Sequence, residues 1–359
     1  MAAAASHDPV ALRDSPLIVS TDIGGDPDDA IALALAAMTE PRLALVVTAD
    51  EFPDGRRSML ARHLLDLLGR EDVVVAAGAT AGERKYWAAD GLVPAGAHPW
   101  PLDLHTAVAS LTDPDSSAPL RWLGIGPLTD LARLLETDSG RRTPLGLARR
   151  LRIWQMGGAL EYRQPDRAEH NFRLDPKAVH TVVGRAENLT LVLSDHTFTP
   201  VMAVDPDSPV YRLLATSSIP WAQVIAHHLD QWFARFHPAS MLHDPLTLAA
   251  LQGAFVSFDH REFRLEPDAR MHLGPGRIAR LSSGVDYLGF LEWVLATLRA
   301  GVPARPGRAR ATTTDPAVRA AAAGSESLGN TVHFAAHRTT SGSTSQFGQH
   351  DGLPKFRQG

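Results

Sequence analysis

Four aspartates crowd one short segment near the start of the chain, and these residues have the clearest capacity for chemistry. They are Asp22, Asp26, Asp28 and Asp29. Carboxylates this close repel one another and raise one another's pKa unless a cation or a shared proton compensates. Their oxygens suit a hard ion such as Ca²⁺ or Mg²⁺, and the chain has no cysteine that could supply thiolate ligands. An acidic helix start would explain one or two aspartates better than four, so the segment predicts a divalent metal site.

The residues around these aspartates predict a strand, a tight turn and a helix. Leu17 to Val19 form a short apolar run, and Gly24 and Gly25 permit the turn. Pro27 suits the first position of the alanine-rich helix that follows. In open α/β sheets ligands bind at the carboxyl ends of the strands, which is where this segment places the acids.

Composition sets broad limits on partners. The chain has 359 residues, of which 44% are hydrophobic, a formal charge of −5 and a pI near 6.3. This balance argues against a surface for nucleic acid polymers, which bind clustered Lys and Arg. No segment has the length of a membrane span, and Met1 to Asp14 do not read as a secretion signal. We therefore expect a cytoplasmic protein that acts on a small molecule.

Apolar runs alternate with helical patterns along most of the chain. This βαβ rhythm predicts an α/β fold, a mostly parallel open sheet with helices on both faces. The expected strands are 17–19, 43–48, 73–75, 120–125, 151–155 and 189–193, and the expected helices are 27–38, 58–68, 128–135, 220–236, 244–252 and 287–298.

The pattern also predicts the domain organisation. Residues 1–15 are expected to be a flexible N-terminus, and residues 16–302 a single catalytic domain. Residues 303–359 are rich in Ala, Thr, Ser, Gly and Arg with few large aliphatic side chains. Such a segment buries too little apolar surface to offset its ordering entropy, so it predicts a disordered tail.

Three further segments carry polar or glycine-rich residues at the ends of expected strands or the starts of expected helices. They are GIGPLTD at 124–130, MGG at 156–158 continuing to AEHNFRLDP at 168–176, and LHDPL at 242–246. Segments far apart in sequence meet in this way at one edge of a sheet, so they predict one shared site.

With the acidic loop, these motifs resemble the inosine-uridine nucleoside hydrolases, which cleave the N-glycosidic bond of ribonucleosides with a bound calcium ion. The resemblance covers roughly residues 16 to 300, and its motifs occur in the family's order. It implies a nucleoside hydrolase fold and a Ca²⁺ cofactor. Members of the family are often oligomers, so the resemblance leaves a homo-oligomer open.

The resemblance also implies the metal ligands. Calcium would be held by Asp22, by both oxygens of Asp29, by the backbone carbonyl of Ile125 and by Asp244. Asp22 would in addition take the proton of the nucleophilic water.

The remaining roles concern the substrate. Asp28, Glu169 and Asn171 would hold ribose hydroxyls, and His243 would be the acid that protonates the leaving base. His243 could instead be a helix-cap residue. Trp232 could stack on the base, or it could belong to the core.

The chain departs from the family pattern at three places. The acidic loop is two residues longer than the usual D-x-G-x-D-D, so Asp26 could replace a ligand. An asparagine expected after the second strand is missing, and Asp50 or Glu51 could substitute for it. The loop between Gly158 and Glu169 also lacks an asparagine, but it has Arg163, which could face an anionic or carbonyl group.

Two other functions stay open at this point. One is a Mg²⁺-dependent phosphohydrolase, although Lys and Arg for phosphoryl oxygens are missing from segments 124–129 and 243–244. The other is a protein that binds a metal and a ribosyl ligand without turnover.

Overall fold

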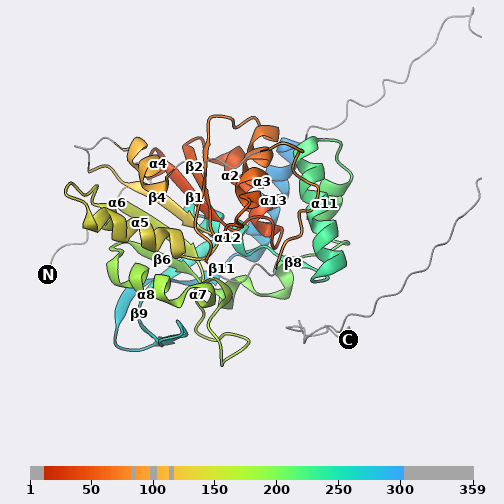
Figure 1. The fold of residues 1–359 in the computed structure, drawn as a ribbon. Coiled ribbons are helices and arrows are strands. Elements are labelled where there is room, and N and C mark those ends of the chain that lie inside the picture. The colour runs from red at the N-terminus through yellow and green to blue at the C-terminus, as the bar shows by residue number, and fades with distance from the viewer. Residues whose placement is uncertain (1–11, 82–85, 98–102, 113–116, 303–359) are drawn as a thin grey trace, which may run out of the picture. The chain divides into compact units, whose positions relative to one another are not determined.

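One large sheet organises the part of the chain described by this computed structural model, residues 12–81, 86–97, 103–112 and 117–302 (Figure 1). Its strands are β1 (Leu17–Thr21), β2 (Leu43–Thr48), β3 (Val74–Ala77), β4 (Leu120–Gly124), β5 (Leu151–Met156), β6 (Leu189–Val192), β9 (Val256–Leu265), β10 (Met271–Leu273) and β11 (Arg277–Val285). They lie in the order β10-β9-β11-β6-β5-β4-β1-β2-β3. Neighbours from β11 to β3 are parallel, whereas β9 and β10 extend the β11 edge as antiparallel strands.

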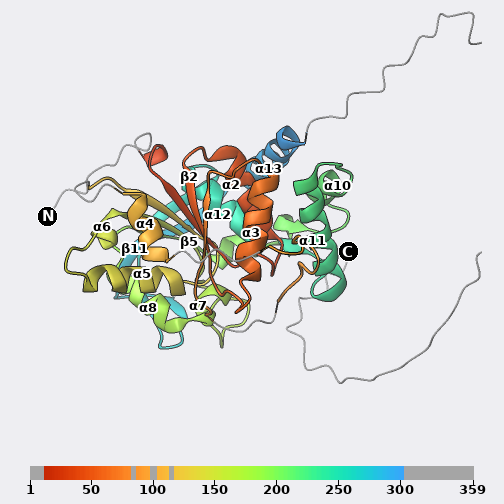
Figure 2. The same cartoon turned by 45° about the horizontal axis from the view of Figure 1, so that its top comes forward.

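Helices cover both faces of this sheet, and the two views agree on the division (Figures 1 and 2). One face carries α2 (Asp28–Thr39), α3 (Arg56–Leu67), α11 (Pro220–Arg235), α12 (His243–Leu251) and α13 (Tyr287–Gly301). The other carries α4 (Leu104–Ser110), α5 (Thr129–Gly140), α6 (Leu147–Arg150) and α8 (Pro176–Arg185). Side chains of β1 alternate between the faces: Leu17 and Val19 enter the first core and Ile18 the second.

Shorter elements complete the described fold. They are α7 (His170–Leu174), α9 (Ser194–Thr197), η1 (Pro200–Met202), α10 (Pro209–Ala215) and the two-stranded sheet of β7 (Ala203–Val204) and β8 (Ser240–Met241).

The strand order reverses next to β1, which positions the site. The chain builds β2 and β3 outward on one side of β1, then returns to place β4, β5 and β6 on the other side. The carboxyl ends of β1 and β4 are adjacent, because the Ile125 amide donates to the Ser20 carbonyl at 2.8 Å. A crevice at such a switch point is the usual place for a ligand in an open α/β sheet.

The expected parallel sheet with helices on both faces is confirmed. The strands β9, β10 and β11 were not expected from the sequence, nor was the antiparallel pairing of β9 with the other two. The expected flexible N-terminus falls mostly on residues 1–11, and the expected tail on 303–359; both ranges lie outside the described residues, so the domain limits stay predictions. No helix of the described ranges has the length and apolar character needed to cross a bilayer.

Candidate active site

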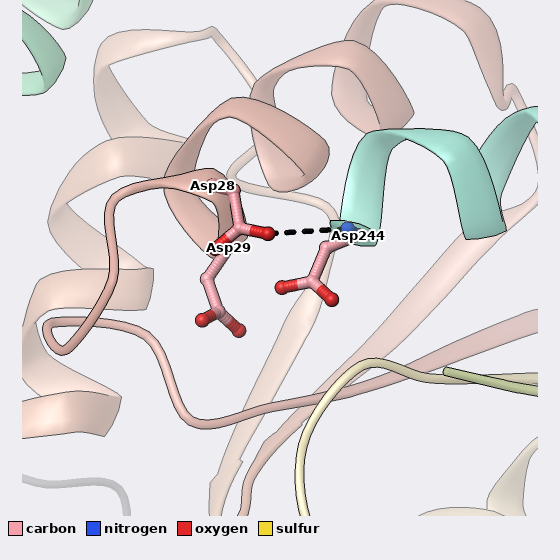
Figure 3. Close-up of side chains that lie close together, drawn as sticks. All are labelled: Asp28, Asp29 and Asp244. Atoms are coloured by element: carbon pink, nitrogen blue, oxygen red, sulfur yellow. Dashed lines mark hydrogen bonds between the residues drawn. The ribbon is translucent and has the colours of Figure 1, made fainter. Parts of the chain in front are cut away.

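Three buried aspartates converge where the helices α2 and α12 begin (Figure 3). Asp28 and Asp29 lie in the first turn of α2, and Asp244 lies in the first turn of α12. Each offers a carboxylate oxygen, and these oxygens lie within 4.8 Å of one another. The Asp244 amide donates to Asp28 Oδ2 at 3.2 Å, which ties the two helix starts together. The structure thus brings together two expected metal ligands, Asp29 and Asp244, and adds Asp28, which was expected on the sugar.

The local sequence explains why the α2 acids point inward. Pro27 has φ −67° and is the residue just before α2. It was expected to be the first residue of the helix. Its carbonyl accepts from the Ile31 amide at 3.1 Å, which is the first hydrogen bond of the helix. The Thr21 hydroxyl at the end of β1 donates to Asp29 Oδ1 and fixes that carboxylate.

Asp22 lies beside the strand ends, as expected for the residue that follows β1. A Cβ added to Gly126 would meet Asp22 Oδ1 at 2.8 Å and the Asp22 amide nitrogen at 3.0 Å. The glycine of the GPLT motif is therefore needed for this close approach. Ile125, the expected carbonyl ligand, lies next to Gly126 on the same turn and is buried. Asp22 does not belong to the compact triad, although its charge acts on all three triad members.

The longer acidic loop is held by contacts of Gly24, Gly25 and Asp26 with other parts of the chain. Gly24 has φ +101°, and a Cβ there would lie 2.3 Å from the Trp87 ring, so only glycine fits. The Gly25 carbonyl accepts from His228 Nε2 at 3.1 Å. Asp26 accepts a hydrogen bond from the Ser240 hydroxyl and lies outside the compact triad.

Burial and mutual repulsion make this cluster a candidate site for a cation. Burial raises the pKa of Asp22 to about 6 and that of Asp26 to about 7. Burial, and then the neighbouring carboxylates, hold the pKa values of the three triad aspartates well above their ordinary range. Oxygen ligands of one Ca²⁺ lie about 2.3 to 2.6 Å from the ion, hence at most roughly 5 Å apart, so the triad spacing fits a hard divalent cation.

Arg57, at the start of α3, is a buried cation at this site that the sequence analysis missed. Its guanidinium donates to the backbone carbonyls of Asp22 and Ile23 through Nη1, and to that of Asp50 at 3.0 Å through Nε. Its charge lowers the pKa of Asp22 and of Asp29, against the larger effect of burial. The sequence shows two adjacent arginines at the helix start, and no local pattern indicates that Arg57 is the buried one.

Asp50 and Glu51 follow the second strand, where the family pattern has an asparagine, and both accept hydrogen bonds from nearby backbone or hydroxyl groups. Glu51 accepts from the Thr48 hydroxyl at 2.6 Å and from the amides of Arg57 and Ser58, so it caps the start of α3. Asp50 Oδ1 accepts from the Ala81 amide at 3.0 Å. Neither carboxylate belongs to the triad.

Glu169 and Asn171 lie buried at the connection between β5 and α7. Glu169 Oε2 accepts from the Gly158 amide at 3.2 Å and from the Phe172 amide at 3.3 Å. Asn171 Nδ2 donates to the Met156 carbonyl at 3.2 Å. The side chains of the AEHN motif thus bind backbone groups of the MGG motif and hold that turn in place.

His243 is held on one side by a hydroxyl and on the other by an aromatic ring. Its Nδ1 lies 2.6 Å from Thr197 Oγ1, which leaves Nε2 free of that contact. Its ring is nearly parallel to Phe198, at 16° and 6.0 Å between centroids. The Arg163 guanidinium lies 4.1 Å above the Phe198 ring. Burial, and then the charge of Arg163, lower the pKa of His243 to about 3.

Trp232 is mostly enclosed, being 4% exposed. Its indole N–H donates to the Ala239 carbonyl at 3.0 Å, and its ring contacts Tyr86 at 5.8 Å and Phe236 at 5.3 Å between centroids. Tyr86, which the sequence analysis also missed, in turn contacts His170 at 6.4 Å. An aromatic cluster therefore joins α11 to α7, and Trp232 packs within it.

Asp130, the last residue of the GPLTD segment, is a buried carboxylate outside the triad, so it shows how burial affects the pKa of an acid in this fold. Its Oδ1 accepts from the Ala79 amide at 2.9 Å, whereas its Oδ2 is buried without a hydrogen-bond partner among the described residues. Burial raises its pKa from 3.8 to about 6. The folded state therefore holds this proton more tightly than the unfolded state, and the stability gained below pH 4 is lost as the pH rises through about 6.

Asp130→Asn is expected to raise the free energy of unfolding at pH 8 by about 1 to 3 kcal/mol, because a neutral side chain replaces an ionised one. Near pH 4 the two proteins should be equally stable. Urea unfolding at both pH values measures this difference, with Glu136→Gln on the exposed side of α5 as control. A variant that is less stable at pH 8 would show that Asp130 has a charged partner.

Comparisons with known proteins agree with this geometry. The sequence profile of the family described as inosine-uridine preferring nucleoside hydrolase matches residues 17–350. A pyrimidine-specific ribonucleoside hydrolase RihA of Shewanella woodyi is 30% identical over 255 residues, which cover 66% of this chain and 78% of that protein. A protein of the same name from Shewanella baltica (strain OS185) is 28% identical over 314 residues, covering 79% and 96%.

Solved structures share the fold. The plant nucleoside hydrolase PpNRh1 superposes with a TM-score of 0.63 at 20% identity, covering 81% of this chain and 99% of that one. An inosine-uridine preferring nucleoside hydrolase from Bacillus anthracis gives 0.63 at 18% identity, covering 79% and 99%. At these identities the likeness shows the fold, and the sequence profile shows the family. The chain belongs to the inosine-uridine preferring nucleoside hydrolase family, as its motifs predict.

Proposed function

We propose that this chain hydrolyses the N-glycosidic bond of a ribonucleoside, with Ca²⁺ held by its buried acids. The observation that carries the proposal is the triad of Asp28, Asp29 and Asp244 at the switch point of the sheet, with Asp22 beside it. The RihA relatives are named for ribonucleoside hydrolysis, and this chain spans 78% to 96% of the two described above. Family, fold and acidic site together support the same reaction.

Asp29 and Asp244 would hold the metal. Asp22 and the backbone carbonyl of Ile125 would be its other two protein ligands. All are oxygen donors, as a hard cation requires. When bound, calcium supplies charge that acidifies a water molecule and orients sugar hydroxyls. Asp28 lies close enough to the other two to join them, so we include it among the candidate ligands.

Asp22 would take the proton of the attacking water. Its raised pKa suits a base, and its backbone is fixed because Arg57 binds its carbonyl and Gly126 lies against its carboxylate. Glu169 and Asn171 would orient ribose hydroxyls, and hydrogen bonds to backbone groups already fix both side chains. Contacts that tighten as the sugar becomes oxocarbenium-like lower the barrier.

His243 would assist departure of the base. Its Nδ1 is engaged by Thr197, so Nε2 is the nitrogen that could face the leaving base. Because burial and then the charge of Arg163 lower the pKa of His243 to about 3, it would act as a neutral imidazole that donates a hydrogen bond from Nε2. The neighbouring Asp244 fixes the backbone from which the imidazole projects, which couples the position of this donor to the metal site.

The phosphohydrolase alternative has less support than hydrolysis of a nucleoside. A phosphohydrolase needs cations that face phosphoryl oxygens, and Arg57 is instead turned to the backbone carbonyls of Asp22 and Asp50. A binding protein without turnover would retain the triad but would not release product. We therefore rank hydrolysis first, in a cytoplasmic enzyme that acts on free nucleosides in purine or pyrimidine salvage.

Removing a triad acid should remove the metal. Asp244→Ala is expected to weaken Ca²⁺ binding by at least about tenfold, since it removes one oxygen donor and one of the charges that attract the ion. Isothermal titration of calcium into chelator-treated protein measures this, with the exposed Asp207→Ala as control. An unchanged affinity would place the metal elsewhere.

The reaction itself is tested by a panel of nucleosides incubated with the purified chain, with excess chelator or with added Ca²⁺. Chromatography of the products should show release of a free base that stops with chelator and returns with calcium. Uridine and cytidine belong in the panel because the relatives are named pyrimidine-specific. Absence of release from every nucleoside, with calcium bound, would overturn the proposal in favour of a binding protein.

A further inference from the structure

Arg57 joins two loops that leave the sheet at neighbouring strand ends. It lies in the first turn of α3 and is 2% exposed. Its guanidinium donates to the carbonyls of Asp22 and Ile23, which follow β1, and to the carbonyl of Asp50, which follows β2. Because β1 and β2 are parallel neighbours, Arg57 ties the two loops together beyond the point where the strands end.

The position of Arg57 is fixed by other residues of the chain. Its amide donates to Glu51 Oε1 at 2.9 Å, and its guanidinium carbon lies 5.0 Å from the centre of the Phe52 ring. Both contacts come from the loop that follows β2. A planar guanidinium held in this way fixes the geometry of the carbonyls that it binds.

A series of hydrogen bonds connects Arg57 to the triad. Arg57 Nη1 donates to the Ile23 carbonyl at 2.9 Å, and the Ile23 amide donates to Thr21 Oγ1 at 3.2 Å. The Thr21 hydroxyl in turn donates to Asp29 Oδ1. Asp22 lies between Thr21 and Ile23, and Arg57 binds its carbonyl as well. Arg57 therefore fixes the backbone that carries Asp22 and is connected to the triad residue Asp29.

The charge and the hydrogen bonds of Arg57 have opposite effects on a divalent cation at this site. Its positive charge acts on Asp22 and Asp29, so Coulomb repulsion alone would weaken the binding of a second cation beside them. Its hydrogen bonds order the loop in advance, so less conformational entropy is lost when an ion binds, which strengthens binding. The change in calcium affinity when Arg57 is replaced therefore shows which effect is larger.

We propose that Arg57 is a positioning residue for the metal site, which holds residues 22–29 in their metal-binding form without calcium and thereby raises the calcium affinity more than its charge lowers it. The inference rests on the proposed calcium site. It goes beyond that proposal because it assigns the ordering of the site to a residue that is not one of the proposed ligands.

Amide hydrogen exchange measures whether the loop is ordered without metal. In excess chelator, the amides of residues 22–29 should exchange at least about tenfold faster in Arg57→Gln than in the unmodified chain, whereas those of strand β5 should not change. Added calcium should restore much of the protection in the variant. Equal exchange of the loop amides in the two proteins, or free exchange in the calcium-free unmodified chain, would overturn the inference.

Isothermal titration of calcium into chelator-treated protein tests the sign of the effect. The dissociation constant should rise by at least about tenfold in Arg57→Gln and by a similar factor in Arg57→Lys, which keeps the charge but lacks the planar fork. Tighter binding by Arg57→Gln would show that charge is the larger effect and would overturn the inference. An affinity of Arg57→Lys within about threefold of the parental value would also overturn it, and this variant decides if Arg57→Gln does not fold.

Arg62→Gln is the matched control. It removes an arginine of the same helix that likewise binds two backbone carbonyls, those of Arg70 and Val73, outside the acidic loop. It should keep the parental calcium affinity and the parental exchange of residues 22–29. A loss as large as that of Arg57→Gln would attribute the effect to general weakening of α3 and overturn the inference.

Neither measurement needs turnover, so this inference and the proposed hydrolysis can fail separately. The expected effects of the Arg57 variants without release of a base from any nucleoside would contradict hydrolysis alone. Calcium-dependent release of a base, with no effect of either Arg57 variant on exchange or affinity, would contradict this inference alone.

Discussion

Asp22→Asn is expected to lower kcat by at least about a hundredfold while the protein stays folded, since the side chain is the proposed base and borders the metal site. Asparagine has nearly the same shape and keeps the close approach to Gly126. It cannot take a proton from water at neutral pH. Steady-state kinetics on the best nucleoside of the panel measure the loss, and thermal unfolding verifies the fold.

Saturating calcium distinguishes the two roles of Asp22. If the residue acts mainly by attracting the ion, excess calcium should restore most of the rate, whereas loss of the base should persist. Asp207→Asn, at an exposed ion pair with Arg212, is the matched control and should keep the parental rate. A near-parental kcat for Asp22→Asn at saturating calcium would exclude Asp22 as the base.

The parallel part of the fold could be predicted because its signals are local. The runs 17–19, 43–48, 120–125, 151–155 and 189–193 are apolar and bounded by helical patterns, and each lies on a strand of the sheet. The acidic loop and the GPLT, MGG and HDP motifs follow strands or begin helices, so their convergence at one edge could also be predicted.

The antiparallel edge could not be predicted in the same way. Strand β9 has a mostly exposed, charged face with Phe263 as its fully buried residue, so its residues resemble a polar loop. Contacts between segments far apart in the sequence could not be predicted either. Arg57 binding to Asp22, Ser240 to Asp26 and the Phe198 ring on His243 each depend on tertiary packing, which no local spacing reveals.

Asp28 shows how motif position and geometry differ. The sequence places Asp28 and Asp29 side by side, and the family pattern divides them between sugar and metal. In the structure both carboxylates lie with Asp244, and the Asp244 amide donates to Asp28. A side chain in that position can bind metal, hydroxyl or both, so the division between the two aspartates stays a prediction.

Glu40→Ala is expected to lower the free energy of unfolding by about 3 to 5 kcal/mol, because it leaves a buried arginine without its counter-charge. Glu40 Oε2 lies 2.8 Å from Arg121 Nη1, and the two side chains are 7% and 2% exposed. Glu40 also accepts from Gln252 Nε2 at 2.8 Å, so the pair joins the end of α2 to strand β4 and to the end of α12. Urea unfolding in excess calcium measures the loss.

Two further variants test the electrostatic reason for this loss. Asp66→Ala breaks an exposed pair with Arg62 and should cost about 1 kcal/mol or less. Replacing both Glu40 and Arg121 by methionine removes both charges, so much of the stability lost in Glu40→Ala should return. If the double variant is less stable than Glu40→Ala, the bonds from Arg121 to the carbonyls of Arg13 and Ser15 carry more of the stability than the ion pair. Arg121 would then stabilise the protein mainly by holding the segment before β1 in place.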